Sequence, residues 1–191
     1  MVGSALMPAA LLGQIAVDPS APPLGLSGKF SYHAKSLVDP AEFLREGISA
    51  GFQQLLDTPY EWGQGAEGFG RRYASSFGST ILRQSITFGL DSTLREDPRY
   101  FRSGETKVSE RIKSALMQAL ICHTDSGGRS FAFARVGGAF GAEFISNAWR
   151  PRSVNAPGDA LIRGGATMAV SAGTNVLREF MPEIKKLLKR H

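Results

Sequence analysis

Glycine recurs inside segments of this chain that otherwise have the periodicity of α-helices, and this feature most restricts its fold. The sequence holds 22 glycines in 191 residues, against a usual share of about 7%. Each glycine in a helix interior costs roughly 0.5–1 kcal/mol relative to alanine, which close tertiary packing must offset. A helix face without side chains lets another backbone approach closely. The predicted packing positions are Gly47, Gly51, Gly70, Ala74, Gly78, Gly89, Gly138, Gly141, Gly164 and Gly173.

Apolar periodicity and helix-boundary residues predict an all-α fold: a bundle of about five glycine- and alanine-rich helices with a short basic C-terminal helix. The clearest start is Asp39-Pro40, where an N-cap aspartate precedes a proline suited to the first turn and Glu42 follows three residues after the cap. Apolar residues then recur at helical spacing until Pro59. They are Leu44, Ile48, Phe52 and Leu55.

The remaining helices are expected from similar patterns. Asp125-Ser126-Gly127-Gly128 predicts a turn between two of them. Phe131 to Arg135 alternates as a strand would, but the alternation ends at Val136-Gly137-Gly138, so we favour helix there. The expected helices run from about 64 or 67 to 94, from 109 to 121, from 130 to 149 and from 158 to 180, with a tail helix starting at Pro182.

The N-terminal part is expected to lie outside the helical domain. Residues 1–17 are apolar and small but have no basic residue before them, as a secretory signal would need. They are interpreted either as a flexible N-terminus or as a signal-peptide remnant. Residues 18–28 carry three prolines and indicate an extended linker. A single helical domain over 29–191 follows.

The charge and the glycine spacing indicate contact with a membrane or an envelope partner. The formal net charge is +5, and the densest basic cluster closes the chain, which suits an anionic lipid surface. Small-x-x-x-small spacing is typical of helix association in membranes. Charged residues interrupt every long apolar window, so a spanning bundle, a surface-bound bundle and a soluble one all stay open. No nucleic-acid motif is present, and a homo-oligomer is possible. The basic cluster is Lys185, Lys186, Lys189 and Arg190.

Motifs for catalysis, cofactors and metals are weak in this sequence. Gly63 to Gly68 matches G-x-G-x-x-G, but a strand would have to precede it in a dinucleotide site. The three histidines have no metal-ligand spacing. Cys122-His123-x-Asp125 are too close in sequence to face one another as a catalytic set. The sequence therefore predicts no catalytic residue, no metal and no cofactor.

Polar and aromatic residues at the two ends of the long helix are the candidate ligand contacts. One end carries Glu61 and Trp62, and the other carries a dense arginine-rich turn. The turn could bind an anion or a lipid headgroup, or its charges could pair with one another to hold helix ends. The turn residues considered are Arg95, Glu96, Asp97, Arg99, Tyr100 and Arg102.

Four motifs resemble those of an uncharacterised family of bacterial secreted or envelope proteins of the acidobacterial type. They are EWGQG at 61–65, GFGRRY at 68–73, EDPRYF at 96–101, and LREF with PEI at 177–184. The resemblance covers roughly residues 29–190 and implies a location in the cell envelope. It carries no activity and no binding residues.

Two functions are consistent with these patterns. The first is a non-catalytic module of the envelope or membrane that packs through small-residue faces and contacts anionic lipid or a partner protein. The alternative is an enzyme or small-ligand-binding protein with a site near Glu61/Trp62 and Glu96/Asp97. The orientation of Arg83, Arg135 and Arg163, inward or outward, is the most informative structural observation.

Overall fold

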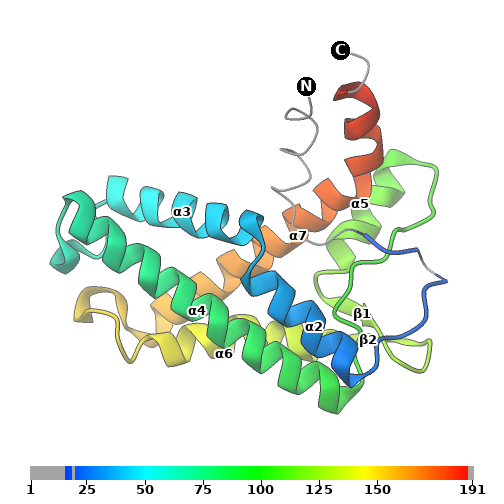
Figure 1. Ribbon diagram of the computed structural model, residues 1–191, viewed down its shortest axis with the longest axis horizontal. Helices are drawn as coiled ribbons and strands as arrows, with labels where there is room; N and C mark the ends of the chain where they lie inside the picture. Colours follow the sequence, from blue (N-terminus) through cyan, green and yellow to red (C-terminus); the bar gives the residue numbers. More distant parts are fainter. Residues whose placement is uncertain (1–15, 19, 189–191) are drawn as a thin grey trace.

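The predicted all-α fold is confirmed by a computed structural model, which describes residues 16–18 and 20–188 (Figure 1). The helices are α2 (Leu26–Leu37), α3 (Pro40–Leu55), α4 (Gly65–Leu94), α5 (Val108–Met117), α6 (Phe133–Ser146) and α7 (Pro157–Leu188). Two short 3-10 turns, η1 (Tyr60–Trp62) and η2 (Arg152–Val154), and one hairpin, β1 (Ile121–His123) with β2 (Arg129–Phe131), complete the described chain.

The long helix α4 is the centre of the arrangement. Its most extensive contact is with α6, and α2 and α3 also lie along α4. Helix α6 packs in turn on α7, and α5 packs on α7 near its C-terminal part. Figure 1 shows α2 and α3 following one another along α4, with the hairpin at the end of the molecule where α4 finishes. Helix α3 therefore packs on α4, α4 on α6, and α6 on α7.

The expected boundaries of the first two predicted helices are confirmed. Asp39 caps α3 by accepting a hydrogen bond from the Ala41 backbone N–H at 2.9 Å, and Pro40 occupies the first helical position. α4 runs from Gly65 to Leu94 and ends at Arg95, whose φ of 57° is left-handed. The long rod and its end before Pro98 follow the sequence pattern.

Helix α2 lies partly where a linker was expected. It begins at Leu26 and has no side-chain cap, so the boundary signals of its sequence are weak. Tertiary contacts compensate for this: Lys29 and His33 are buried against α4. Lys29 Nζ donates to the Asp91 carbonyl at 3.0 Å and to Asp125 Oδ2 at 2.8 Å.

The helices expected to reach Ile121 and to start at Ser130 are both shorter than predicted. The residues between them form the antiparallel hairpin, in which Ile121 pairs with Phe131 and His123 with Arg129. The predicted turn sits at its tip, where Gly127 adopts a φ of +85°. Glycine takes this left-handed conformation at little steric cost, which lets the chain reverse there.

The expected break at Pro182 is wrong, because α7 continues through this residue to Leu188. Proline inside a helix removes one backbone hydrogen bond, so other contacts must hold the two sides together. Arg111 of α5 does this by pairing with Glu179 at 3.1 Å and Glu183 at 2.9 Å, one on each side of the proline. Its guanidinium also lies over the Phe180 ring, 4.2 Å from the centroid.

The predicted close helix packing holds at some glycines and not at others. A Cβ at Gly138 would lie 2.0 Å from Thr87 Oγ1, and one at Gly164 would lie 2.5 Å from the Phe140 ring. At Gly78 and Gly141 the nearest atoms would be at ordinary contact distance. The remaining predicted glycines do not line a close contact between helices of this chain, because a Cβ there would meet nothing within 4 Å. They are Gly47, Gly51, Gly70, Gly89 and Gly173.

Candidate functional site: a polar cavity beneath an apolar outer surface

The described interior is made mainly of small and polar side chains, and many of the large apolar ones are exposed. Alanines dominate its buried apolar residues, with Tyr100 and Phe101 as the only aromatic ones. The largest side chains that are fully buried are instead polar. In order of size they are Arg72, Lys29, Glu179, Asp91, Asp97 and Ser146. Soluble domains ordinarily bury Leu, Ile, Val and Phe, and bury charges only when these are paired.

Helix α3 shows this reversal clearly. An amphipathic helix ordinarily turns its apolar stripe toward the core. Here Glu42 and Glu46 are buried together with two alanines, whereas the stripe at helical spacing is exposed. Its members Leu44, Ile48, Phe52 and Leu55 are 46%, 48%, 63% and 82% exposed.

A cavity of about 840 Å³ lies behind this reversed helix. Residues of α2, α3, α4, α6 and α7 form most of its wall. All three arginines chosen as most informative, Arg83, Arg135 and Arg163, line this cavity and so point inward. The charges that interrupt the apolar windows of the sequence therefore lie on the inward faces of their helices.

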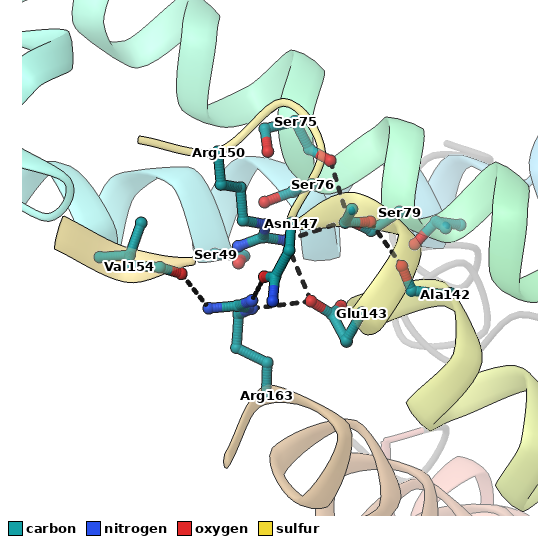
Figure 2. A network of polar contacts seen from close by, with 12 residues as sticks. Ser49, Ser75, Ser76, Ser79, Ala142, Glu143, Asn147, Arg150, Val154 and Arg163 are labelled. Atoms are coloured by element: carbon teal, nitrogen blue, oxygen red, sulfur yellow. Dashed lines mark hydrogen bonds and ion pairs between the residues drawn. The ribbon is translucent and has the colours of Figure 1, made fainter. Parts of the chain in front are cut away.

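Glu143 of α6 is the centre of the polar contacts on the α7 side of the cavity (Figure 2). Arg150 donates to its Oε2 at 3.1 Å, and Arg163 Nε donates to the same atom at 2.8 Å. Arg163 also reaches the Val154 carbonyl at 2.8 Å and Asn147 Oδ1 at 2.5 Å. One carboxylate thus joins α6, the following turn and α7, and two cations share it.

A second cluster lies on the α3 side of the cavity. Glu42 pairs with Arg45 and with Arg83, the latter at 3.0 Å. Arg83 also donates to Thr80 Oγ1, which donates to Glu46 Oε1 at 2.7 Å. Burial raises the pKa of Glu46, and the hydrogen bond from Thr80 opposes this only in part. Glu46 is a buried carboxyl group whose proton is held more tightly than usual.

Serines connect the two long helices between these clusters. Ser79 of α4 and Ser146 of α6 lie 2.7 Å apart through their hydroxyl oxygens, and Arg150 donates to Ser79 at 3.0 Å. Trp149 donates from its indole nitrogen to Ser75 at 3.0 Å. Small side chains here allow close helix contact and also satisfy the buried polar groups.

The two ends of α4, predicted to form one ligand site, do not come together. A 30-residue helix separates them, about 45 Å at 1.5 Å per residue. Glu61 is exposed and accepts a hydrogen bond from Ser153 at 2.7 Å. Trp62 lines one end of the cavity, and Glu96, Asp97 and Tyr100 line another part of it.

In the arginine-rich turn, several of the predicted contact residues are engaged within the protein. Glu96 accepts from the backbone N–H groups of Phe133 and Ala134, both at 3.1 Å, and so caps α6. Arg99 pairs with Asp97 at 2.6 Å. Tyr100 donates to Glu179 at 2.6 Å. Arg95 and Arg102 are exposed.

The glycines of the G-x-G-x-x-G match lie in the loop before α4 and in its first turn, around the side chain of Arg72. Arg72, fully buried, donates to the carbonyls of Thr58, Pro59 and Gly63 at 2.6–2.9 Å. A Cβ at Gly68 would lie 2.2 Å from the Gly63 carbonyl oxygen. The loop therefore wraps around an arginine, and the preceding strand of a dinucleotide site is replaced by helix α3 and η1.

Of the basic tail, Lys185 is half-buried and Lys186 exposed on the last turns of α7, whereas Lys189 and Arg190 lie outside the described residues. Within residues 16–18 and 20–188, no group of three His, Cys, Asp or Glu side chains could hold a metal ion. No helix in that part of the chain has both the length and the apolarity needed to cross a bilayer.

Sequence reasoning did not select Glu46, Glu143 or Arg150 as site residues, although Glu143 was recognised as a charge that interrupts an apolar window. Glu42 and Glu46 are four residues apart, and this spacing is equally typical of a solvated helix face. Comparisons with protein families, curated proteins and solved structures gave no match to this chain. The candidate site therefore rests on the geometry of its own residues.

Proposed function

We propose that this chain is a non-catalytic helical module of the cell envelope that works at a membrane, with its outer apolar helix faces in contact with lipid acyl chains. One observation carries the proposal: the described part of the protein buries charged and small side chains while it exposes many of its large apolar ones. Water penalises this arrangement on both counts, whereas a lipid environment removes the penalty for the apolar outer faces.

The spread of exposed apolar residues favours lipid over a single protein partner. A protein interface usually gathers apolar residues in one patch. Here every described α-helix contributes to the apolar surface. Representative members are Phe30 on α2, Phe52 on α3, Phe133 on α6, and Ile162 and Val170 on α7. A fluid medium can cover faces that point in several directions.

The pairing of the interior charges is also consistent with membrane contact. Charges in a nonpolar environment are tolerated when they turn inward and neutralise one another. Glu42 with Arg83 and Glu143 with Arg163 are such pairs. Amphipathic helices that lie in the interfacial plane bury their apolar face among the acyl chains, and the exposed stripe of α3 suits that position.

An enzyme with a site at the two ends of α4 has less support. Its two predicted pairs of residues lie at opposite ends of α4, and Glu96 and Asp97 are engaged in capping and pairing. The resemblance to envelope proteins favours the first function and supplies no activity.

Vesicle flotation with the full chain tests the proposal. We expect the chain to float with vesicles of neutral phosphatidylcholine, and high salt should leave this binding unchanged because apolar contact is not screened. Anionic phosphatidylglycerol should add a salt-sensitive part through basic residues such as Lys186. A chain that stays unbound at low salt, or binds only anionic vesicles and leaves them at high salt, would contradict the proposed acyl-chain contact.

A paired variant assigns the contact to helix α3. Phe52→Gln replaces an exposed apolar side chain of α3, and Ser85→Gln places the same side chain at an exposed polar position of α4. We expect the first to weaken binding to neutral vesicles several-fold and the second to leave it unchanged. Circular dichroism of both variants checks that the helices persist.

A further inference from the structure

Glu46 of α3 is a buried carboxyl group with which no cation of the described chain pairs. It is 9% exposed and lines the cavity. Among the described residues its only hydrogen bond comes from Thr80, which donates to Oε1 at 2.7 Å. The second oxygen, Oε2, has no partner there and is not fully buried, so it can be reached from the cavity. Buried polar atoms are ordinarily satisfied, and this oxygen therefore indicates that a hydrogen-bond donor belongs beside it.

The charge of the cavity wall favours a cation as that donor. Carboxylates outnumber arginines among the residues that line the cavity. The other carboxylates already have an arginine, a histidine or a backbone N–H group as partner. Outside the two clusters described above, these are Asp39 and Asp159, which accept from backbone N–H groups, Asp91 with His33, Asp97 with Arg99, and Glu96, which caps α6. Among the described lining residues, Glu46 is thus the carboxyl that remains without such a partner.

The cations around Glu46 are engaged with other carboxylates. The charged groups that act on it electrostatically are Glu42, Arg45, Arg83 and Arg150. Arg45 and Arg83 both pair with Glu42, and Arg150 pairs with Glu143. Burial raises the pKa of Glu46, so the free protein favours the protonated carboxyl. A cationic group that enters the cavity can take the place of this proton, because an opposite charge nearby favours the ionised form.

Hydroxyl groups lie close to Glu46 in the cavity wall. Ser49 and Ser76 line the cavity one helical turn from Glu46 and Thr80, and Gln53 donates to the hydroxyl oxygens of both at 3.2 Å. A hydroxyl oxygen has two lone pairs, so each can accept a further N–H bond.

The outer part of the same cavity is apolar. It is lined by exposed side chains of α3 and α7, which are Ile48, Phe52, Ile162 and Val170. Ligand pockets usually have about 300–1,000 Å³, and this one has about 840 Å³. A buried carboxyl group inside an apolar outer part fits a molecule with a cationic head and a hydrocarbon chain.

We infer that the cavity binds an amphiphile whose primary ammonium headgroup donates to Glu46 Oε2 and whose hydrocarbon chain lies between Ile48 and Ile162. A primary ammonium has three N–H donors, one for the carboxylate and the others for the neighbouring hydroxyl oxygens. This site goes beyond contact with a bilayer and does not depend on it, because a water-soluble amine can be tested without vesicles.

Calorimetric titration of the full chain, held in an uncharged amphipathic polymer with the polymer alone as blank, tests this inference. The probes are octylamine, octanol, octanoate and methylamine. At neutral pH we expect saturable binding of octylamine, about tenfold tighter than that of octanol or octanoate, because an ion pair with a buried carboxylate is added. A titration near pH 5 in two buffers of different ionisation enthalpy should show that octylamine releases the proton of Glu46 to the buffer and that octanol does not.

Four results would overturn the inference. Equal binding of octanol would show that the carboxyl group plays no part, and octanoate binding as tight as that of octylamine would show that the site has no preference for a cation. Equal binding of methylamine would show that the apolar part plays none, and binding of no probe would remove the site altogether. Since none of these probes forms vesicles, a failure here leaves the flotation result untouched, and the two proposals can fail separately.

Two substitutions of Glu by Gln provide a matched pair of variants. Glu46→Gln removes the carboxylate of the site and resembles the protonated side chain in shape, whereas Glu67→Gln removes one from an exposed position of α4 outside the cavity. We expect Glu46→Gln to bind octylamine about tenfold more weakly and to release no proton, with octanol binding unchanged, and Glu67→Gln to bind as the wild type does. Equal octylamine affinity of the two variants contradicts the assignment to Glu46.

Neighbouring residues of α7 test the location of the chain independently of Glu46. Ile162 lines the cavity, whereas Leu161 does not, and both side chains are exposed. We expect Ile162→Lys to weaken octylamine binding about tenfold by placing a like charge in the outer part, and Leu161→Lys to leave it unchanged. If the two variants bind octylamine equally, the chain does not lie along this part of α7 and the inference fails.

Discussion

Two alanine substitutions should have opposite effects on stability, although both replace glycine in a helix. At Gly89 of α4 a Cβ would meet nothing within 4 Å, whereas at Gly138 of α6 it would lie 2.0 Å from Thr87 Oγ1 and 3.1 Å from the Arg83 carbonyl oxygen. The Thr87 hydroxyl can rotate away, but the backbone oxygen moves only with α4. Gly138→Ala therefore forces apart the two helices that pack most extensively.

The magnitude follows from two terms. Alanine gains roughly 0.5–1 kcal/mol of helix propensity at both positions, so this term cancels in the comparison. Overpacking at Gly138 costs typically 1–3 kcal/mol. Gly89→Ala should stabilise the protein, and Gly138→Ala should lie about 1–3 kcal/mol below it. For a chain of this size each kcal/mol corresponds to about 2–4 °C in Tm.

Thermal melting of both variants and the wild type, in one buffer and one carrier, measures this difference. Urea denaturation gives an independent free energy of unfolding. If Gly138→Ala is as stable as Gly89→Ala, the backbone of α6 does not depend on the missing side chain to approach α4. The explanation of the helical glycines by close packing would then be refuted at the glycine where an added Cβ would meet the shortest contact.

Three further predictions concern buried polar groups. Arg72→Met should lower the free energy of unfolding by about 3 kcal/mol or more, because several buried acceptors lose their donor; a loss under about 1 kcal/mol in urea denaturation would contradict this. Burial raises the pKa of Glu46 in the folded state, so the contribution of Glu46 to the free energy of unfolding is full below the ordinary pKa of 4.5 and is lost as pH rises through the folded pKa. The stability of the wild type relative to Glu46→Gln should therefore fall over that pH range. A difference that does not change with pH would argue against burial of the carboxyl group. At Glu179 burial raises the pKa, but hydrogen bonds from Tyr100, Ser103 and Arg111 outweigh this effect, and the pKa is lowered. The wild type should therefore be more stable than Glu179→Gln above pH 4.5, and this difference in stability should disappear as pH falls through the folded pKa. A difference that persists in acid would show that the ionised carboxylate does not stabilise the fold.

Local signals were sufficient for the helices that carry strong boundary residues. Asp39-Pro40 fixed the start of α3, and Pro98 limited the end of α4. They were not sufficient where tertiary contacts determine the structure. α2 has no side-chain cap and is held through buried Lys29. The continuity of α7 through Pro182 depends on Arg111, which is remote in sequence.

The candidate site was less predictable than the fold because the sequence does not show which face of each helix is turned toward the interior. A helix periodicity says that two faces differ, and it does not say which one faces the interior. For α3 the two readings give opposite roles to Glu46, a solvated carboxylate or a buried one. The pairing of Glu143 with Arg163 likewise joins two helices whose register the sequence leaves open.

The orientation of α3 contains an argument about its surroundings. Fully burying one side chain the size of Leu, Ile or Phe contributes about 1.5–3 kcal/mol in water, so half-exposed Leu44, Ile48 and Phe52 together forgo a few kcal/mol. Burying Glu42 and Glu46 adds a desolvation cost, which pairing with Arg83 and the bond from Thr80 only reduce. Total stabilities are about 5–15 kcal/mol. In water, a rotation of α3 by half a turn, which would bury its apolar stripe and expose its glutamates, would therefore increase the stability by a sizeable share of the total. The mean hydropathy of −0.11 does not reveal this arrangement, because an average over the chain does not show which residues face outward. The arrangement becomes favourable once acyl chains replace water at the outer face of α3, while Glu46 keeps its hydrogen bond from Thr80 in the interior.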